Sequence, residues 1–149
     1  MAEQHEMRVL ITGVDAEGRS CVVSEERVVL GSDPASSGFW FGSPFETTSA
    51  PPPARPPGRG EDLDIGLAPG VVRWQVIDYP EGPSYPVHHT DSVDLDIVLE
   101  GTIELTLDDG VHVLQVGEGA VINGVDHTWA GGPGGARLSA ICIGTPPAR

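Results

Sequence analysis

The chain has 149 residues, which fits one domain with a single hydrophobic core. Its 20 glycines and 14 prolines indicate many turns, while a hydrophobic fraction of 39% excludes a wholly disordered chain. All eight basic residues are arginine, which excludes lysine Schiff-base chemistry and a P-loop lysine, and the net charge of -14 argues against nucleic acid or an anionic membrane surface as partner.

The first residues are polar and contain no apolar run of signal-peptide length, so we expect a cytoplasmic protein. The two cysteines, Cys21 and Cys142, lie in apolar segments with a strand-like pattern and have no cysteine or histidine close to them in sequence. We therefore expect two buried free thiols rather than a zinc site.

The N-terminal part contains short runs of β-branched residues, at positions 8–12, 21–23 and 27–30. A turn signal from Asp15 to Gly18 separates the first two runs, which predicts an N-terminal β-hairpin. Residues 39–41 are the candidate third strand. We expect residues 1–48 to form an extension that packs on the main domain or on a partner.

Residues 49–60 contain five prolines, which cannot donate hydrogen bonds to a sheet. This composition predicts an exposed, extended loop, which we place at residues 49–69. A proline-rich ligand for an SH3-like partner is the alternative interpretation, but a spacer is the commoner use of such a segment.

Strand signals become dense from residue 70 onward, with Gly, Pro or Asp-Gly turns between them. The predicted strands are residues 71–79, 93–99, 102–107, 111–116, 120–122, 127–130 and 137–143. This spacing is typical of an antiparallel sandwich or barrel, and no long, capped amphipathic helix interrupts it. The sequence therefore predicts an all-β domain at residues 70–145.

Histidines and glycines in this part follow an ordered pattern. The first motif contains Gly82, His88, His89, Asp94 and Gly101, and the second contains Gly117, Gly124 and His127. In order and spacing the two motifs resemble those of the cupin superfamily. The resemblance covers about half of the chain, and the strand-turn-strand sequence around Gly101 and Asp108 to Gly110 agrees with it.

The cupin resemblance implies a jelly-roll barrel, also called a double-stranded β-helix, with the N-terminal β-hairpin as an extension. Small bacterial single-domain cupins commonly exchange such strands between two copies. The resemblance therefore implies a homodimer.

The motifs depart from a full cupin set at the metal ligands. Such a set would have a second His at Thr90, a Glu at Asp94, a Pro near Ile122 and an Asn at Gly131. Since threonine is not a usual ligand of divalent metals, the four-ligand version of the site is lost.

Alternation along the strands indicates which side chains share a face. If His88 points inward, so does Thr90, while His89 points outward. On the next strand Asp94, Asp96 and Val98 share the inner face, and His127 shares a face with Trp129. The set His88, Asp94 and His127 would suit Fe(II), with Mn, Ni or Zn as further candidates, although Asp94 is one carbon shorter than Glu.

Asp96 is an unexpected acid for an inward position. Desolvation and repulsion between Asp94 and Asp96 should raise the pKa of at least one of them, which leaves a protonated acid near neutral pH. Such a group can act as a general acid, and His88 or His127 can act as the base. This chemistry needs no metal, so the residues leave open whether the cavity holds one divalent metal or no cofactor.

Other residues are candidates for substrate contacts or for surfaces. Trp74, Tyr85 and Trp129 are candidate pocket walls, with core packing as the alternative use of a strand tryptophan, and Thr90 and Val98 complete the expected substrate surface. We expect His5, His89 and His112 to be structural or surface residues, Arg73 and Arg137 to lie on the surface, and the acidic run 61–64 to be solvated. Leu95, Ile97 and Leu99 would form an apolar outer row suited to a dimer interface.

Three functions follow from these residues. The leading hypothesis is a cupin enzyme, of the lyase or isomerase type, that uses acid-base chemistry to dehydrate, cyclise or isomerise a hydrophobic natural-product-like substrate. The first alternative is a metal-dependent oxygenase that uses His88, Asp94 and His127. The second alternative is a module that binds a small organic ligand without converting it.

Overall fold

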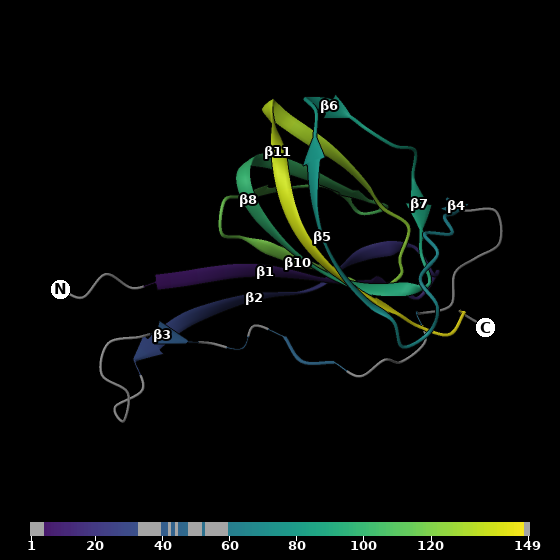
Figure 1. The fold of residues 1–149 in the computed structure, drawn as a ribbon, viewed down its shortest axis with the longest axis horizontal. Helices are drawn as coiled ribbons and strands as arrows, with labels where there is room; N and C mark the ends of the chain where they lie inside the picture. Colours follow the sequence, from purple (N-terminus) through teal and green to yellow (C-terminus); the bar gives the residue numbers. More distant parts are fainter. Residues whose placement is uncertain are drawn as a thin grey trace.

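The computed structural model describes residues 5–32, 40–41, 43, 45–47, 52 and 60–147. These residues form an all-β structure in which nearly all of the regular elements belong to one mixed, eight-stranded sheet (Figure 1). The predicted all-β class is therefore confirmed. Within these residues no helix occurs, and so none is long and apolar enough to cross a membrane.

The N-terminal hairpin predicted from the sequence is present. It consists of β1 (His5–Val14) and β2 (Ser20–Ser32), to which β3 (Trp40–Phe41) adds a short antiparallel pair. The Asp15 carboxylate closes the turn by accepting hydrogen bonds from the backbone N–H groups of Glu17 and Arg19, each at 2.9 Å. Phe39, the first residue of the predicted third strand, lies outside the described residues.

The proline-rich segment is described only at Pro52 and Gly60. Pro52 is buried, and a Cβ atom added to Gly124 would lie 2.4 Å from the Pro52 Cβ. At Pro52 the prediction of an exposed loop is therefore wrong, because this proline packs against the turn that precedes His127. The other prolines of the segment lie outside the described residues.

The main domain contains five longer strands and three short ones. The longer strands are β5 (Val72–Tyr79), β8 (Ser92–Leu107), β9 (Gly110–Gln115), β10 (Gly119–Ile122) and β11 (Thr128–Gly144). The short ones are β4 (Glu61–Asp62), β6 (Gly82–Pro83) and β7 (His88–His89).

The strand order of the sheet is β3-β2-β1-β10-β8-β11-β5, with β9 paired to β8. All neighbours are antiparallel except β1 and β10, which run parallel from Val9 to Ile11. The strands of this sheet that lie in residues 70–145 pair antiparallel, as predicted, and the parallel pair arises where the N-terminal hairpin joins the sheet along the edge of β10. The two edge strands of this sheet, β3 and β5, are not paired with each other in the described residues, so strand pairing does not close the sheet into a barrel there.

In two places, two strands that were predicted separately form one continuous, bent strand. The predicted strands 93–99 and 102–107 form β8, which bends at Gly101, and residues 127–130 and 137–143 form β11, whose register shifts between Gly131 and Ala136. Figure 1 shows the yellow β11 turning back on itself at the top of the view. The bend lets one strand pair cover two sides of the interior.

The concave side of the bent sheet encloses the main core. Its fully buried side chains include Leu10, Ile103, Leu105, Ile122 and Leu138. In the second half of β11, buried and half-buried residues alternate, as expected for a strand with one face on a core. This inner face of β11 and the facing half of β8 carry the polar residues considered below.

The convex side of the sheet is also apolar. A second cluster there contains Val9, Val93 and Val121, with Leu95 and Phe45 packed against it. Further side chains of this face are exposed to solvent, namely Val72, Trp74, Val76, Ile97 and Leu99. The predicted apolar outer row of Leu95, Ile97 and Leu99 therefore lies opposite the face of Asp94 and Asp96.

Candidate functional site

A cavity of about 230 Å³ lies on the concave face of the sheet. It is lined by Leu63, Ile65, Gln75, Ile77, Tyr79, Tyr85, His88, Thr90, Asp94, Asp96, His127, Trp129, Leu138, Ala140 and Cys142. The four residues predicted to carry chemistry, His88, Asp94, Asp96 and His127, are thus brought together. The other cavity-lining residues form a largely apolar wall.

The two histidines meet through the backbone. His88 N–H donates to the carbonyl of His127 at 3.0 Å, and His127 N–H donates to the carbonyl of His88 at 2.9 Å. This bridge joins β7 to the turn before β11 and places the two imidazole ring centroids 4.5 Å apart. Residues 39 positions apart in sequence therefore form one histidine pair, as the cupin-like spacing predicts.

Backbone carbonyls fix the tautomer of both rings. The Nδ1 atom of His88 lies 2.9 Å from the carbonyl oxygen of Pro86, and that of His127 lies 2.9 Å from the carbonyl oxygen of Val125. A carbonyl only accepts hydrogen bonds, so each Nδ1 carries the proton. In a neutral ring Nε2 is then the unprotonated nitrogen, and the described residues give it no hydrogen-bond partner in either histidine.

His127 is held neutral. Its side chain is buried, and this burial, with a smaller contribution from His88, lowers the pKa of His127 from 6.5 to about 4. At pH 7 the Nε2 atom of His127 is therefore an unprotonated base that faces the cavity.

The two acids of β8 have opposite hydrogen-bonding environments. Asp94 accepts a hydrogen bond from Ser92 Oγ at 2.7 Å, and the Ser92 hydroxyl in turn lies 2.7 Å from Thr90 Oγ1. Burial raises the pKa of Asp94, while the hydrogen bonds from Ser92 and Cys142 partly offset this rise. Asp94 is therefore held in place by its neighbours.

Asp96 is 7% exposed and has no side-chain hydrogen bond to any described residue. Burial, together with repulsion from Asp94, raises the pKa of Asp96 well above its usual value. A raised pKa was expected for at least one of the two acids, and both acids have one. Burial thus favours the protonated form of Asp96, which lines the cavity without a hydrogen-bond partner in the described part of the protein.

Three aromatic side chains surround the histidine pair. The ring of Tyr85 meets His88 edge-on, with centroids 5.2 Å apart, and Trp129 meets His127 edge-on at 6.2 Å. Tyr79 lies 6.5 Å from Trp129 and was not singled out from the sequence. Tyr85 and Trp129 therefore line the cavity as predicted, and Tyr79 joins them because it is on the inner face of β5.

Trp74 and Val98 do not line the cavity. Trp74 is 75% exposed, because the inward residues of β5 are Gln75, Ile77 and Tyr79, so its prediction as a pocket wall is wrong. Val98 faces inward as predicted but is buried in the core cluster that also contains Trp129 and Leu138. The face of β5 that carries Val72, Trp74 and Val76 points outward. The alternation in the sequence shows which residues share a face but not which face is inside.

Arg73 also differs from its predicted place on the surface. It lies on the same side of β5 as Gln75, and its guanidinium donates to the carbonyl oxygens of Ile65 and Gly66, at 2.8 and 3.3 Å. These hydrogen bonds fix the C-terminal end of the segment 61–67 to β5. At its other end β4 pairs with β7, and Leu63 N–H donates to the carbonyl of His89 at 2.9 Å.

Residues 61–64 were expected to be solvated loop, and for Leu63 this expectation is wrong. Leu63 and Ile65 line the cavity, while Glu61, Asp62 and Asp64 are exposed. The alternation of acidic and apolar residues in this short stretch was the signal that could have identified an edge segment. Ser92 and Cys142 were likewise missed as neighbours of Asp94.

The remaining histidines with described side chains are engaged elsewhere. His89 points away from the cavity and lies 2.6 Å from a carboxylate oxygen of the buried Asp126, and His112 lies 2.7 Å from Asp109. Both fit their predicted structural roles. The side chain of His5 lies outside the described residues.

The residues do not fit the predicted metal set. Across residues 5–32 and 60–147 and the short described pieces between them, no three His, Cys, Asp or Glu side chains are arranged to hold a metal ion. The cysteines do not supply a site either: both are free, Cys142 is buried as predicted, and Cys21 is only half-buried.

Two curated fungal proteins are similar to part of this chain. They are phomopsin biosynthesis cluster protein C' and phomopsin biosynthesis cluster protein D, both from Diaporthe leptostromiformis. Each is 37% identical over 62 residues, which are 41% of this chain and 33% of the relative. The chain thus matches a third of the length of these relatives, and no protein-family model matches it.

Proposed function

We propose that this protein is a small enzyme that moves protons on an organic substrate, as in a dehydration, cyclisation or isomerisation. The observation that carries this proposal is that one cavity is lined by a buried acid and a buried base, and burial favours the uncharged form of each. Asp96 offers a proton without a protein partner, and His127 offers an unprotonated Nε2. Groups of this kind contribute to catalysis when their protonation states match the task near neutral pH.

Each reaction class follows from the same two groups. Asp96 donates a proton to a carbonyl or hydroxyl oxygen of the substrate, while His127 removes a proton from carbon. In an isomerisation His127 delivers its proton to another carbon, and the enol O–H returns its proton to Asp96. In a dehydration the protonated hydroxyl leaves as water, and the proton on His127 then passes to Asp96. Neither reaction consumes an oxidant or a reductant. His88 is the second candidate for the base.

The specific fold within the all-β class is also part of this proposal. We assign the chain to a cupin-type jelly roll on the strength of the two sequence motifs, the bent β8 and β11, and the β4–β7 pair beside the cavity. The similarity to two proteins of a phomopsin biosynthesis cluster supports a role in natural-product biosynthesis. A cytoplasmic location and a homodimer are part of the same proposal.

Isotope exchange tests the acid-base function without knowledge of the natural substrate. Cyclohexanone in D₂O exchanges its α-hydrogens for deuterium when an acid protonates the carbonyl oxygen and a base removes the α-proton. We expect the protein to accelerate this exchange above the buffer rate, measured by NMR. Asp96→Asn and His127→Gln should each lower the acceleration by about 100-fold, since each removes one proton-transfer group.

Matched substitutions outside the cavity serve as controls. His112→Gln and Asp62→Asn remove the same chemical groups at positions that do not line it, and both should retain the wild-type rate. Treatment with a chelator should also leave the rate unchanged. Exchange that persists in Asp96→Asn and His127→Gln, or that needs an added divalent metal, would contradict the proposal.

A further inference from the structure

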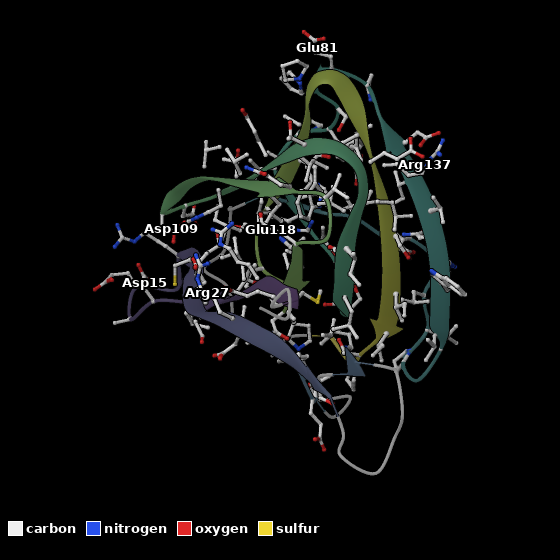
Figure 2. All side chains as sticks on the ribbon, turned by 90° about the vertical axis from the view of Figure 1, so that its left-hand side faces the viewer. Asp15, Arg27, Glu81, Asp109, Glu118 and Arg137 are labelled. Atoms are coloured by element: carbon white, nitrogen blue, oxygen red, sulfur yellow. The ribbon has the colours of Figure 1, made fainter. Side chains whose placement is uncertain are left out.

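The first observation concerns positive charge. All five arginines in the described part of the chain are engaged outside the cavity: Arg8, Arg19, Arg27 and Arg137 in ion pairs with carboxylates, and Arg73 with backbone carbonyls. Figure 2 shows Arg137 at the outside of the molecule, and the side chain of Arg27 is 61% exposed. Since the sequence contains no lysine, no arginine or lysine side chain from the described residues lines the cavity.

The polar end of the cavity also carries two acids. A ligand carboxylate or phosphate would lose its hydration there and would meet Asp94 and Asp96 without a compensating charge. Arginine is the usual partner of such anions because its guanidinium binds two of their oxygens at once. The described lining therefore disfavours anionic ligands.

An ammonium ligand is also disfavoured at Asp96. It would require an ionised carboxylate there, but Asp96 is buried beside Asp94, and both burial and the neighbouring acid favour its uncharged form. The other acid, Asp94, already accepts hydrogen bonds from Ser92 and Cys142. A protonated carboxyl group instead donates a hydrogen bond to oxygen. The missing partner of Asp96 is thus best supplied by a hydroxyl or carbonyl oxygen of the ligand.

The other residues that line the cavity indicate the polarity and the size of the ligand that fits it. Ile77, Leu138 and Trp129 form an apolar wall, and Leu63 and Ile65 add to it from the segment 61–67. The cavity of 230 Å³ corresponds to about eight water molecules at about 30 Å³ each, which is the size of a six-membered ring with one or two substituents.

We propose that the cavity accepts an uncharged, ring-sized group that carries a hydroxyl or carbonyl oxygen, and that it rejects carboxylates, phosphates and ammonium groups. The oxygen lies at the Asp96 end, and the ring packs on the apolar wall. This inference rests on the proposed acid-base function and names the substrate class that this function would use. The group is a complete small molecule or one end of a larger one.

Three ligands that share a cyclohexane ring test the inference: cyclohexanol, cyclohexylamine and cyclohexanecarboxylate. Each is titrated at pH 7 into the wild-type protein, and the NMR signals of the His127 ring and the Trp129 indole report binding. We expect cyclohexanol to shift both signals and to bind about 100-fold more tightly than the carboxylate, because a buried uncompensated charge costs several kcal/mol. The amine should also bind more weakly than the alcohol.

A variant that fills the cavity locates the binding. Ala140 is buried in the lining, so Ala140→Leu should abolish the response to cyclohexanol, whereas Val111→Leu on the exposed surface should not. Equal or tighter binding of the amine or the carboxylate would overturn the inference. So would a failure of cyclohexanol to shift the His127 and Trp129 signals, a result that does not depend on the variant.

This outcome can be separated from that of the proposed function. Tight binding of the carboxylate together with cyclohexanone exchange that depends on Asp96 would overturn the ligand class and support the acid-base function. Selective binding of cyclohexanol without any exchange would support the ligand class and overturn the function.

Discussion

His127 and Asp96 show the same physical effect with opposite consequences. Burial disfavours the charged form of any group, so it lowers the pKa of a histidine and raises that of an aspartate. In this cavity burial favours the neutral form of both groups, which is the form in which a histidine accepts and a carboxyl group donates a proton.

The depressed pKa of His127 has a consequence for stability. Unfolded His127 takes up a proton below pH 6.5, but the folded form does so only below about pH 4. Its contribution to the free energy of unfolding is therefore complete above pH 6.5 and is lost as the pH falls towards 4. The full loss is about 3 kcal/mol, from roughly 1.4 kcal/mol per pKa unit.

Denaturant unfolding at pH 7 and pH 4.5 measures this loss. Asp96 acts in the opposite direction over the same range, because its raised pKa keeps a proton on the folded state, so the informative quantity is the difference between wild type and His127→Gln. The variant should lack the His127 contribution, and His112→Gln should behave like wild type. Identical pH dependence in wild type and His127→Gln would show that His127 is not held neutral by the fold.

At the scale of elements, the cavity depends on the bend of β8. Gly101 occupies the bend with φ of 72°, and an added Cβ atom would lie 2.2 Å from the carbonyl oxygen of Gly135 on β11. Glycine is needed here for two reasons, the left-handed backbone and the close approach of the neighbouring strand. The cupin-like motif predicts a glycine at this place, but the contact with β11 explains it.

Alanine substitutions at Gly101 and Gly117 distinguish the effect of the left-handed backbone from that of the close approach of β11. Gly117 has a similar φ of 84°, but an added Cβ atom meets no atom within 4 Å. Gly117→Ala should cost about 1 kcal/mol from backbone strain alone, while Gly101→Ala should cost about 3 kcal/mol or more because the clash is added. Denaturant midpoints of both variants measure the difference, and equal midpoints would mean that β8 and β11 do not approach as closely as described.

At the scale of the whole molecule, the convex face of the sheet is the surface on which two copies are expected to meet. In the sheet, Ser139 of β11 lies directly between Val76 of β5 and Ile97 of β8. Ile141 lies in the same way between Trp74 and Leu95. On β5, β8 and β11 the first charged side chains of this face are those of Arg137, Asp78 and Glu100, at the margin that Figure 2 shows beside Arg137. For a chain of net charge -14, an uncharged stretch of these three strands is where self-repulsion is weak.

Light scattering during gel filtration tests this expectation. The wild-type protein should elute as a dimer, and Ile97→Glu or Trp74→Glu should shift it to the monomer by placing like charges at the interface. Val111→Glu changes an equally exposed valine on β9 and should leave the dimer intact. A monomeric wild type, or a dimer that is unaffected by Ile97→Glu and Trp74→Glu, would contradict this arrangement.

Sequence patterns were enough to predict the all-β class, the N-terminal hairpin and four residues that meet in the cavity, namely His88, Asp94, Asp96 and His127. These features are local or periodic: turn residues mark the hairpins, alternation places Asp94 with Asp96, and the motif spacing links His88 to His127. Alternation also separated His89 from the cavity, since neighbouring residues on a strand point to opposite faces.

What surrounds those residues depends on the tertiary structure. Alternation says which side chains share a face of β5 but not which face is inside, so Trp74 and Arg73 were placed on the wrong sides. Leu63, Ile65 and Cys142 reach the cavity through strand pairs that are distant in sequence, and burial by the whole fold sets the protonation of Asp96 and His127. Desolvation depends on every atom around a group, and no local pattern contains that information.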